Sequence, residues 1–161
     1  ACGVPANMFE PYEEKVSRVR RLVLLLDIHP ILVHFPQAFA FTILVIAGLC
    51  LAVSGEVGAI LLATLKTLSF CLPFTILLAT VAGFIDGKTR FRKVTTPILV
   101  KKIILSIFFL VFSLGNFVMV LFMPLSGTVL RAILSLAFAS FVCSSILGLL
   151  GTKLLNAKFP G

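Results

Sequence analysis

The amino-acid sequence predicts an all-α integral membrane protein, with four transmembrane helices in an antiparallel up-down bundle and both termini in the cytoplasm. Three observations support this fold class. Of the 161 residues, 60% are hydrophobic and 12% are charged, which is about half the charged fraction of a typical soluble domain. The mean hydropathy is +1.17. The lysines and arginines lie in short segments between long apolar runs, as expected when those runs cross a bilayer.

The N-terminal residues 1–21 differ from the rest and are interpreted as a soluble segment, while residues 22–161 form the predicted membrane domain. The first 20 residues are polar and include acidic groups. They therefore do not resemble a secretory signal peptide, which needs a basic start followed by an apolar core. The chain does not begin with Met, which indicates either processing or a fragment.

The first span is predicted at about residues 30–53. These 24 residues carry no formal charge and would form about 36 Å of helix, enough to cross a hydrocarbon layer of about 30 Å. His29 stands at the N-cap position, and Pro30 suits the first turn, where its missing N–H would be unpaired anyway. Pro36 is expected to kink the first turns because it removes a backbone hydrogen bond.

Three further spans are predicted at about residues 62–86, 103–123 and 130–152. The third span contains Asn116 as its single strongly polar side chain, which favours an interhelical hydrogen bond. The fourth carries a stripe of small residues at a spacing of four: Ser140, Ser144 and Gly148. Small residues are also simply common in membrane helices, but this spacing lets a neighbouring helix approach closely. The stripe is therefore the predicted helix-packing surface.

The distribution of basic residues predicts the topology. The segments before the first span, between the second and third, and after the fourth contain four, six and two Lys or Arg, which is twelve of the fourteen in the chain. Only Lys66 and Arg131 fall on the other side. By the positive-inside rule both termini are cytoplasmic, and His29, His34 and Asp86 lie near the cytoplasmic surface. The same pattern explains the net charge of +8 without a nucleic-acid partner.

The two histidines of the chain, His29 and His34, are the candidate cofactor ligands, because neutral imidazole binds metals and haem. In one helix their separation corresponds to about 500° of rotation, so the rings diverge by roughly 140°. They cannot then share one metal or be opposite axial ligands of one haem, unless the prolines break the helix. Two alternatives stay open: His29 only caps the helix, and His34 only hydrogen-bonds a neighbouring span.

Asp86 lies at the cytoplasmic end of the second span, where a carboxylate can pair with a histidine and orient it; pairing with loop lysines is the alternative. Three cysteines fall inside apolar runs and are expected to pack as small hydrophobes: Cys50, Cys71 and Cys143. With two histidines, few carboxylates and no Gly-rich phosphate loop, hydrolase and nucleotide chemistry are not expected. The sequence therefore predicts no independent catalytic activity.

Residues 29–36 read His-Pro-Ile-Leu-Val-His-Phe-Pro, and residues 82–86 read Ala-Gly-Phe-Ile-Asp. Together these motifs resemble a family of bacterial four-helix membrane proteins of unknown function, with the signature HPxLVHFP and a later (A/T)GxxD at the end of the second helix. The resemblance covers about residues 25–155 and implies the bacterial inner membrane. The third helix of that family usually opens with another histidine. This chain has Lys101 and Lys102 there, so a site built from several histidines is not implied.

Residues 2–11, Cys-Gly-Val-Pro-Ala-Asn-Met-Phe-Glu-Pro, resemble the closing segment of rubredoxin-like domains, CPxCGxxKxxFEP. The resemblance implies that Cys2 is the last of four thiolate ligands of one iron. The earlier ligands are missing from this chain. Rubredoxin-like domains occur fused to the membrane family, so a truncated N-terminus is favoured over a vestigial segment.

Three functions follow as hypotheses. The first is an electron-transfer module, in which a cytoplasmic rubredoxin-like head passes electrons to a haem, a quinone or a partner complex near His29, His34 and Asp86. The second is a non-catalytic accessory or anchor subunit of a respiratory or photosynthetic complex, docked through the small-residue stripe, in which His34 could ligate a pigment. An ion or proton carrier is the weaker third, since only Lys66 and Asn116 are polar deeper in the spans. The expected partners are the lipid bilayer and other membrane subunits or a redox partner.

Overall fold

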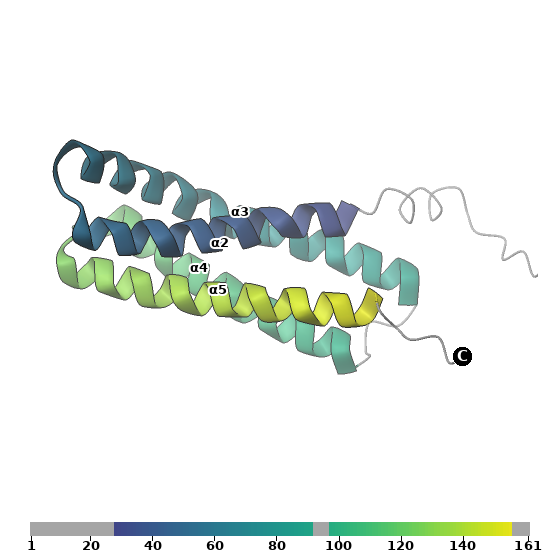
Figure 1. Ribbon diagram of the computed structural model, residues 1–161. Helices are drawn as coiled ribbons and strands as arrows, with labels where there is room; N and C mark the ends of the chain where they lie inside the picture. Colours follow the sequence, from purple (N-terminus) through teal and green to yellow (C-terminus); the bar gives the residue numbers. More distant parts are fainter. Residues whose placement is uncertain (1–27, 92–96, 156–161) are drawn as a thin grey trace, which may run out of the picture.

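The computed structural model describes residues 28–91 and 97–155, and these residues form four long helices (Figure 1). The helices are α2 (Ile28–Ala52), α3 (Gly55–Phe91), α4 (Pro97–Phe122) and α5 (Gly127–Leu155). Consecutive helices run in opposite directions, so the start of α2 and the end of α5 lie at the same end of the bundle (Figure 1). For the described residues, the predicted four-helix, all-helical architecture is confirmed.

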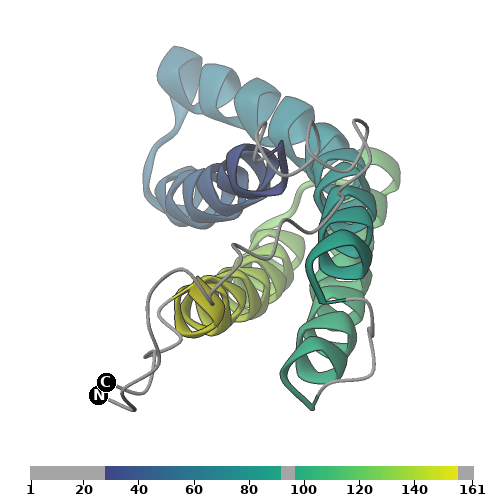
Figure 2. The same ribbon diagram turned by 90° about the vertical axis from the view of Figure 1, so that its right-hand side faces the viewer.

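The helices form a bundle in which each helix has two neighbours. Helix α2 packs against α3 and α5, and α4 packs against the same two helices, so that α2 and α4 are diagonal to each other (Figure 2). The bundle core consists of side chains that are fully or almost fully buried, and it includes Ala40, Ile43, Ala47, Leu65, Leu72, Val120, Ile133 and Ala137. Small residues in this set allow the helix backbones to approach closely.

The connection from α2 to α3 is a two-residue turn that depends on glycine. Gly55 has a φ of 76°, in the left-handed region that glycine occupies without a steric penalty. Three residues later, a Cβ added to Gly58 would lie 2.8 Å from the carbonyl oxygen of Val53. The first turn of α3 therefore packs directly against the backbone of the connection that follows α2.

The other helix starts follow ordinary capping rules. Pro97 is the first residue of α4, a position where proline is favoured because its missing N–H has no partner in a helix. Ser126 precedes α5, and its hydroxyl oxygen accepts a hydrogen bond from the Val129 N–H at 3.4 Å, as an N-cap residue does.

All four helices begin before the spans inferred from the sequence, and the difference is largest for α3 and α4. Helix α3 has 37 residues, whereas the predicted span covers residues 62–86, and α4 begins at Pro97 rather than near residue 103. A helix satisfies its own backbone hydrogen bonds and has no need to stop where the hydrocarbon layer stops. The helix ends thus do not measure the membrane boundaries.

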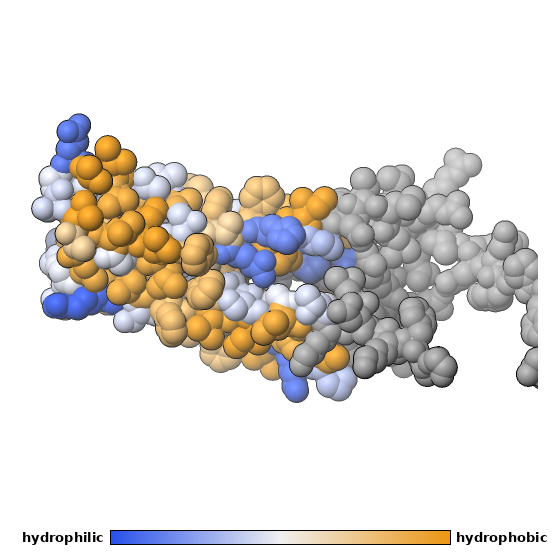
Figure 3. Space-filling view, in the orientation of Figure 1, coloured by the Kyte–Doolittle hydropathy of each residue, from blue (hydrophilic) through white to orange (hydrophobic). Residues whose placement is uncertain are grey.

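The outer surface of the bundle is largely apolar. Many large hydrophobic side chains are more than half exposed, among them Ile60, Leu78, Phe138 and Leu149. The space-filling view shows hydrophobic residues over much of the visible face (Figure 3). Each of the four helices is long and apolar enough to cross a membrane. These features are those of a multi-pass membrane protein, because lipid tails can solvate such a surface and water cannot.

Candidate functional site

His29 lies in the first turn of α2 and its imidazole packs against α3. Its Nδ1 is 3.1 Å from the carbonyl oxygen of Ala79. Because a carbonyl oxygen only accepts, the hydrogen bond requires the proton on Nδ1. Gly83, one turn further along α3, gives the ring its space, since a Cβ there would lie 2.7 Å from Cε1 of His29. His29 therefore joins α2 to α3. Because α2 begins at Ile28, His29 lies inside the first turn and not at the N-cap position expected from the sequence.

His34 has the opposite orientation. Its side chain is exposed, and it lies on α2 beside Ile31 and Phe35, which are 59% and 50% exposed. No hydrogen bond or ion pair links it to another residue within the described ranges. The two rings diverge, as the five-residue spacing predicts. A ligand of His34 would therefore lie outside the bundle, against the outer face of α2.

Asp86 lies at the same end of the bundle as His29, three residues after Gly83 on α3. The carboxyl group is half-buried. It interacts electrostatically with the ammonium group of Lys102, a half-buried residue of α4. At this end, a hydrogen bond from the His29 imidazole thus joins α2 to α3, and an electrostatic attraction acts between α3 and α4.

Gln37 makes a polar contact between α2 and α5 that was not predicted from the sequence. Its amide nitrogen donates to the carbonyl oxygen of Ser144 at 3.2 Å, and a Cβ on Gly148 would lie 2.9 Å from that nitrogen. A hydrogen bond therefore joins α2 to α5 at a glycine, as the His29 hydrogen bond joins α2 to α3 at Gly83. The signal was present in the sequence, because a glutamine inside an apolar span is as unusual as Asn116.

The small-residue stripe of α5 faces the interior of the bundle. Ser140 and Ser144 are 0% and 2% exposed, and Gly148 is covered by Gln37. Ser144 and Gly148 pack against α2, because both contact Gln37. The related expectation that the stripe docks another subunit is wrong. Ser140 and Ser144 are buried within the described bundle and Gln37 lies over Gly148, so the stripe is not an outer face of the bundle.

Asn116 is fully buried between α4 and α5. With its amide oriented to suit its neighbours, the nitrogen donates to the Ile133 carbonyl at 3.1 Å and the oxygen accepts from the Ala137 N–H at 3.3 Å. The side chain thus lies alongside one backbone turn of α5. A buried amide that satisfies both its donor and its acceptor in this way stabilises a helix pair in an apolar medium.

The cysteines contribute no metal centre within the described part of the chain. Cys50, Cys71 and Cys143 are free thiols, the first two half-buried and the third buried, as their apolar surroundings predict. No group of three His, Cys, Asp or Glu side chains among the described residues could hold a metal ion. Cys2, the candidate iron ligand, lies outside the described residues.

Fold and site together define the class of protein: a four-helix bundle of membrane type, with polar side chains that bond its helices to one another and a single exposed imidazole, His34, on its outer face. Comparison with family models, with curated proteins and with solved structures found no match to this chain.

Proposed function

We propose that this chain is an accessory or anchor subunit of a larger membrane redox complex in the bacterial inner membrane, with both termini in the cytoplasm. The orientation is supported by the basic residues, twelve of fourteen on one side, following the positive-inside rule. The helix directions agree with it, because the start of α2 and the end of α5 lie at the same end of the bundle (Figure 1). Insertion itself is supported by the four long apolar helices.

The observation that carries the accessory role is the contrast between the interior and exterior polar groups. The polar side chains of His29, Gln37 and Asn116 are engaged in hydrogen bonds between helices. His34 instead points outward from an apolar helix face. An imidazole placed in this way can ligate a haem or pigment, or hydrogen-bond a partner helix, at an interface between subunits.

The test is isolation of the full chain in a mild detergent together with its complex. We expect a stoichiometric assembly larger than one chain, and we expect His34→Ala to release its partner subunits or to abolish cofactor absorbance. Ile146→Ala is the matched control, since Ile146 is also exposed, at 41%, but belongs to α5. A wild-type chain that is a stable monomer with no cofactor band would contradict the proposal.

A second candidate, a membrane electron-transfer module, is favoured by the segment at residues 2–11. In this proposal Cys2 completes a four-thiolate iron site of a rubredoxin-like head. The head would stand at the cytoplasmic end of the bundle, near His29, His34 and Asp86. Iron analysis and an absorption spectrum of the protein with its complete N-terminal region test this. Stoichiometric iron that is lost in Cys2→Ser supports an electron carrier, while an iron-free protein leaves only the accessory role.

A further inference from the structure

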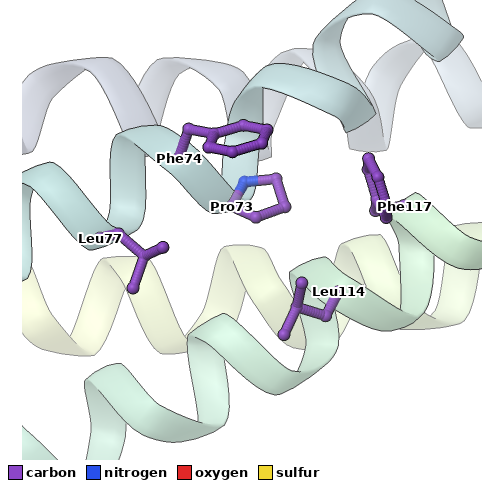
Figure 4. Close-up of a pocket in the computed structure, with 5 residues that line it drawn as sticks. All are labelled: Pro73, Phe74, Leu77, Leu114 and Phe117. Atoms are coloured by element: carbon purple, nitrogen blue, oxygen red, sulfur yellow. The ribbon is translucent and has the colours of Figure 1, made fainter.

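An apolar groove opens on the outer surface between α3 and α4 (Figure 4). Its lining consists of Pro73, Phe74 and Leu77 of α3 and Leu114 and Phe117 of α4, and its volume is about 120 Å³. Phe74 and Leu77 are 52% and 47% exposed, so the groove faces the surroundings of the bundle rather than its core. The volume is well below the roughly 300 Å³ at which sites for whole small molecules begin. The groove suits one part of a flexible chain.

Two lysines define the depth of this groove along α3. Lys66 and Lys88 are both exposed, and each is 11 residues from Leu77. Eleven residues make three helical turns to within about 20°, so the three residues form one line on the same face of the helix. Each lysine is then about 16 Å from the groove along the axis. The two lysines are about 33 Å apart, close to the thickness of the hydrocarbon layer.

This spacing puts the groove at the middle of a bilayer when both ammonium groups reach the headgroup regions. One leaflet contributes about 15 Å of hydrocarbon, which matches the distance from either lysine to the groove. A lipid whose headgroup binds at one lysine therefore ends its acyl chain at the groove.

The charges favour the end of the bundle at Lys88. Lys101 and Lys102 lie at this end on α4, and Lys88 and Lys101 are exposed. The carboxylate of Asp86 interacts with Lys102, which leaves the exposed ammonium groups of Lys88 and Lys101 in excess. Basic positions between transmembrane helices at the cytoplasmic surface attract anionic headgroups.

We propose that this face of α3 and α4 is a binding site for an acidic phospholipid. Its phosphate pairs with Lys88, and one acyl chain runs along α3, past Phe84, to end in the groove at Pro73 and Phe117. The proposal rests on the membrane insertion proposed above but not on the accessory role. The test of the lipid site is therefore independent of the identity of any partner complex.

The absence of tryptophan from the sequence allows a clean optical test. Phe74→Trp introduces a reporter at the groove, and Phe138→Trp introduces a matched one on α5, where Phe138 is 59% exposed. Each full-length variant is reconstituted in phosphatidylcholine vesicles that contain a small fraction of lipid with brominated acyl chains, carried either by phosphatidylglycerol or by phosphatidylcholine. Bromine quenches tryptophan on contact, so quenching reports which lipid occupies the neighbouring position.

We expect brominated phosphatidylglycerol to quench the Phe74→Trp reporter at about fivefold lower mole fraction than brominated phosphatidylcholine, the preference that one ammonium–headgroup pair supplies. The two lipids should quench the Phe138→Trp reporter equally. Lys88→Gln in the Phe74→Trp background should remove the preference, and Lys66→Gln should preserve it. A Leu114→Trp reporter on α4 provides the same readout if Phe74→Trp fails to fold.

Equal quenching by both lipids at the groove, or a preference that survives Lys88→Gln, would overturn the proposal. So would a groove reporter that neither lipid quenches while Phe138→Trp is quenched, because a protein partner then covers the groove. If an isoprenoid quinone relieves the quenching of the Phe74→Trp reporter by brominated lipid and unlabelled phosphatidylglycerol does not, the groove binds a quinone tail instead. If neither reporter is quenched, membrane insertion itself has failed, together with the function proposed above.

Discussion

Helix α2 contacts both of its neighbours through polar side chains that lie over glycines, whereas the middle of the α3–α4 contact is apolar and open. His29 lies over Gly83 and Gln37 lies over Gly148, each with a hydrogen bond to a backbone carbonyl. The groove at Pro73 has neither feature. Lipid tails are as apolar as leucine, so the hydrophobic effect does not drive helices together in a bilayer. Close van der Waals packing and hydrogen bonds stabilise helix pairs there. The α2 contacts, together with the buried Asn116 amide between α4 and α5, are therefore expected to contribute most of the specificity of the bundle.

The largest effect is expected at Gly83. Gly83→Ala should be about 2 kcal/mol less stable than the control Gly151→Ala, because the new methyl group displaces the His29 ring and overpacks the contact. Nothing lies within 4 Å of a Cβ on Gly151. The free energies of unfolding are measured by SDS titration in mixed micelles.

The same measurement in a His29→Ala background distinguishes a clash with the ring from any general intolerance of α3 to a methyl group. There the cost of Gly83→Ala should largely disappear, which gives a coupling energy between the two positions. If the cost is the same in both backgrounds, His29 and Gly83 do not form the contact described above.

Asn116→Ala should have the next largest effect, about 1 kcal/mol of lost stability. It removes an amide that donates to the Ile133 carbonyl and accepts from the Ala137 N–H. Val118→Ala is the control on the same helix, because Val118 is 49% exposed. A loss at Val118 as large as the loss at Asn116 would show that the α4–α5 contact does not depend on the amide.

A smaller loss, about 0.6 kcal/mol, is expected for Gln37→Met. Methionine keeps the length of the side chain over Gly148 and removes the donor to the Ser144 carbonyl, so the variant measures the hydrogen bond apart from the packing. Unchanged stability in the SDS titration would indicate that Gln37 acts through its shape alone.

The smallest effect is expected in the groove. Leu114→Ala should change the free energy of unfolding by less than about 0.5 kcal/mol, because Leu114 is 43% exposed and a lipid chain can follow the altered surface, as with other surface substitutions. Ile133→Ala, at a position that is 0% exposed, should cost several-fold more, since it leaves a cavity. Comparable losses at the two positions would remove the distinction between groove and core.

Much of the fold could be predicted from the sequence, because long apolar runs bounded by charges have few alternatives to membrane helices. The interhelical hydrogen bond expected at Asn116 and the packing of Ser140, Ser144 and Gly148 against a helix are present in the structure. The topology, the lipid environment and the iron site of Cys2 remain predictions from the sequence.

The candidate site was less predictable. The docking role expected for the stripe of α5 was wrong because sequence spacing reveals that a helix packs closely there, but not which helix. A role for Gln37 was not predicted, because an isolated glutamine in an apolar span indicates a hydrogen bond but not the helix that accepts it. The groove at Pro73 could not be predicted, since it depends on which side chains of α3 and α4 come together.

The sequence by itself determined that four apolar helices form and that His29 and His34 diverge on one of them, because composition and helical periodicity are properties of the chain alone. Only the tertiary structure decided which histidine faces the bundle. That choice depends on the rotation of α2 about its axis, which is set by close contacts at Gly83 and Gly148. Both glycines are more than 45 residues from His29 and Gln37 in the sequence. They allow these two side chains to reach neighbouring backbones, while His34 remains outside.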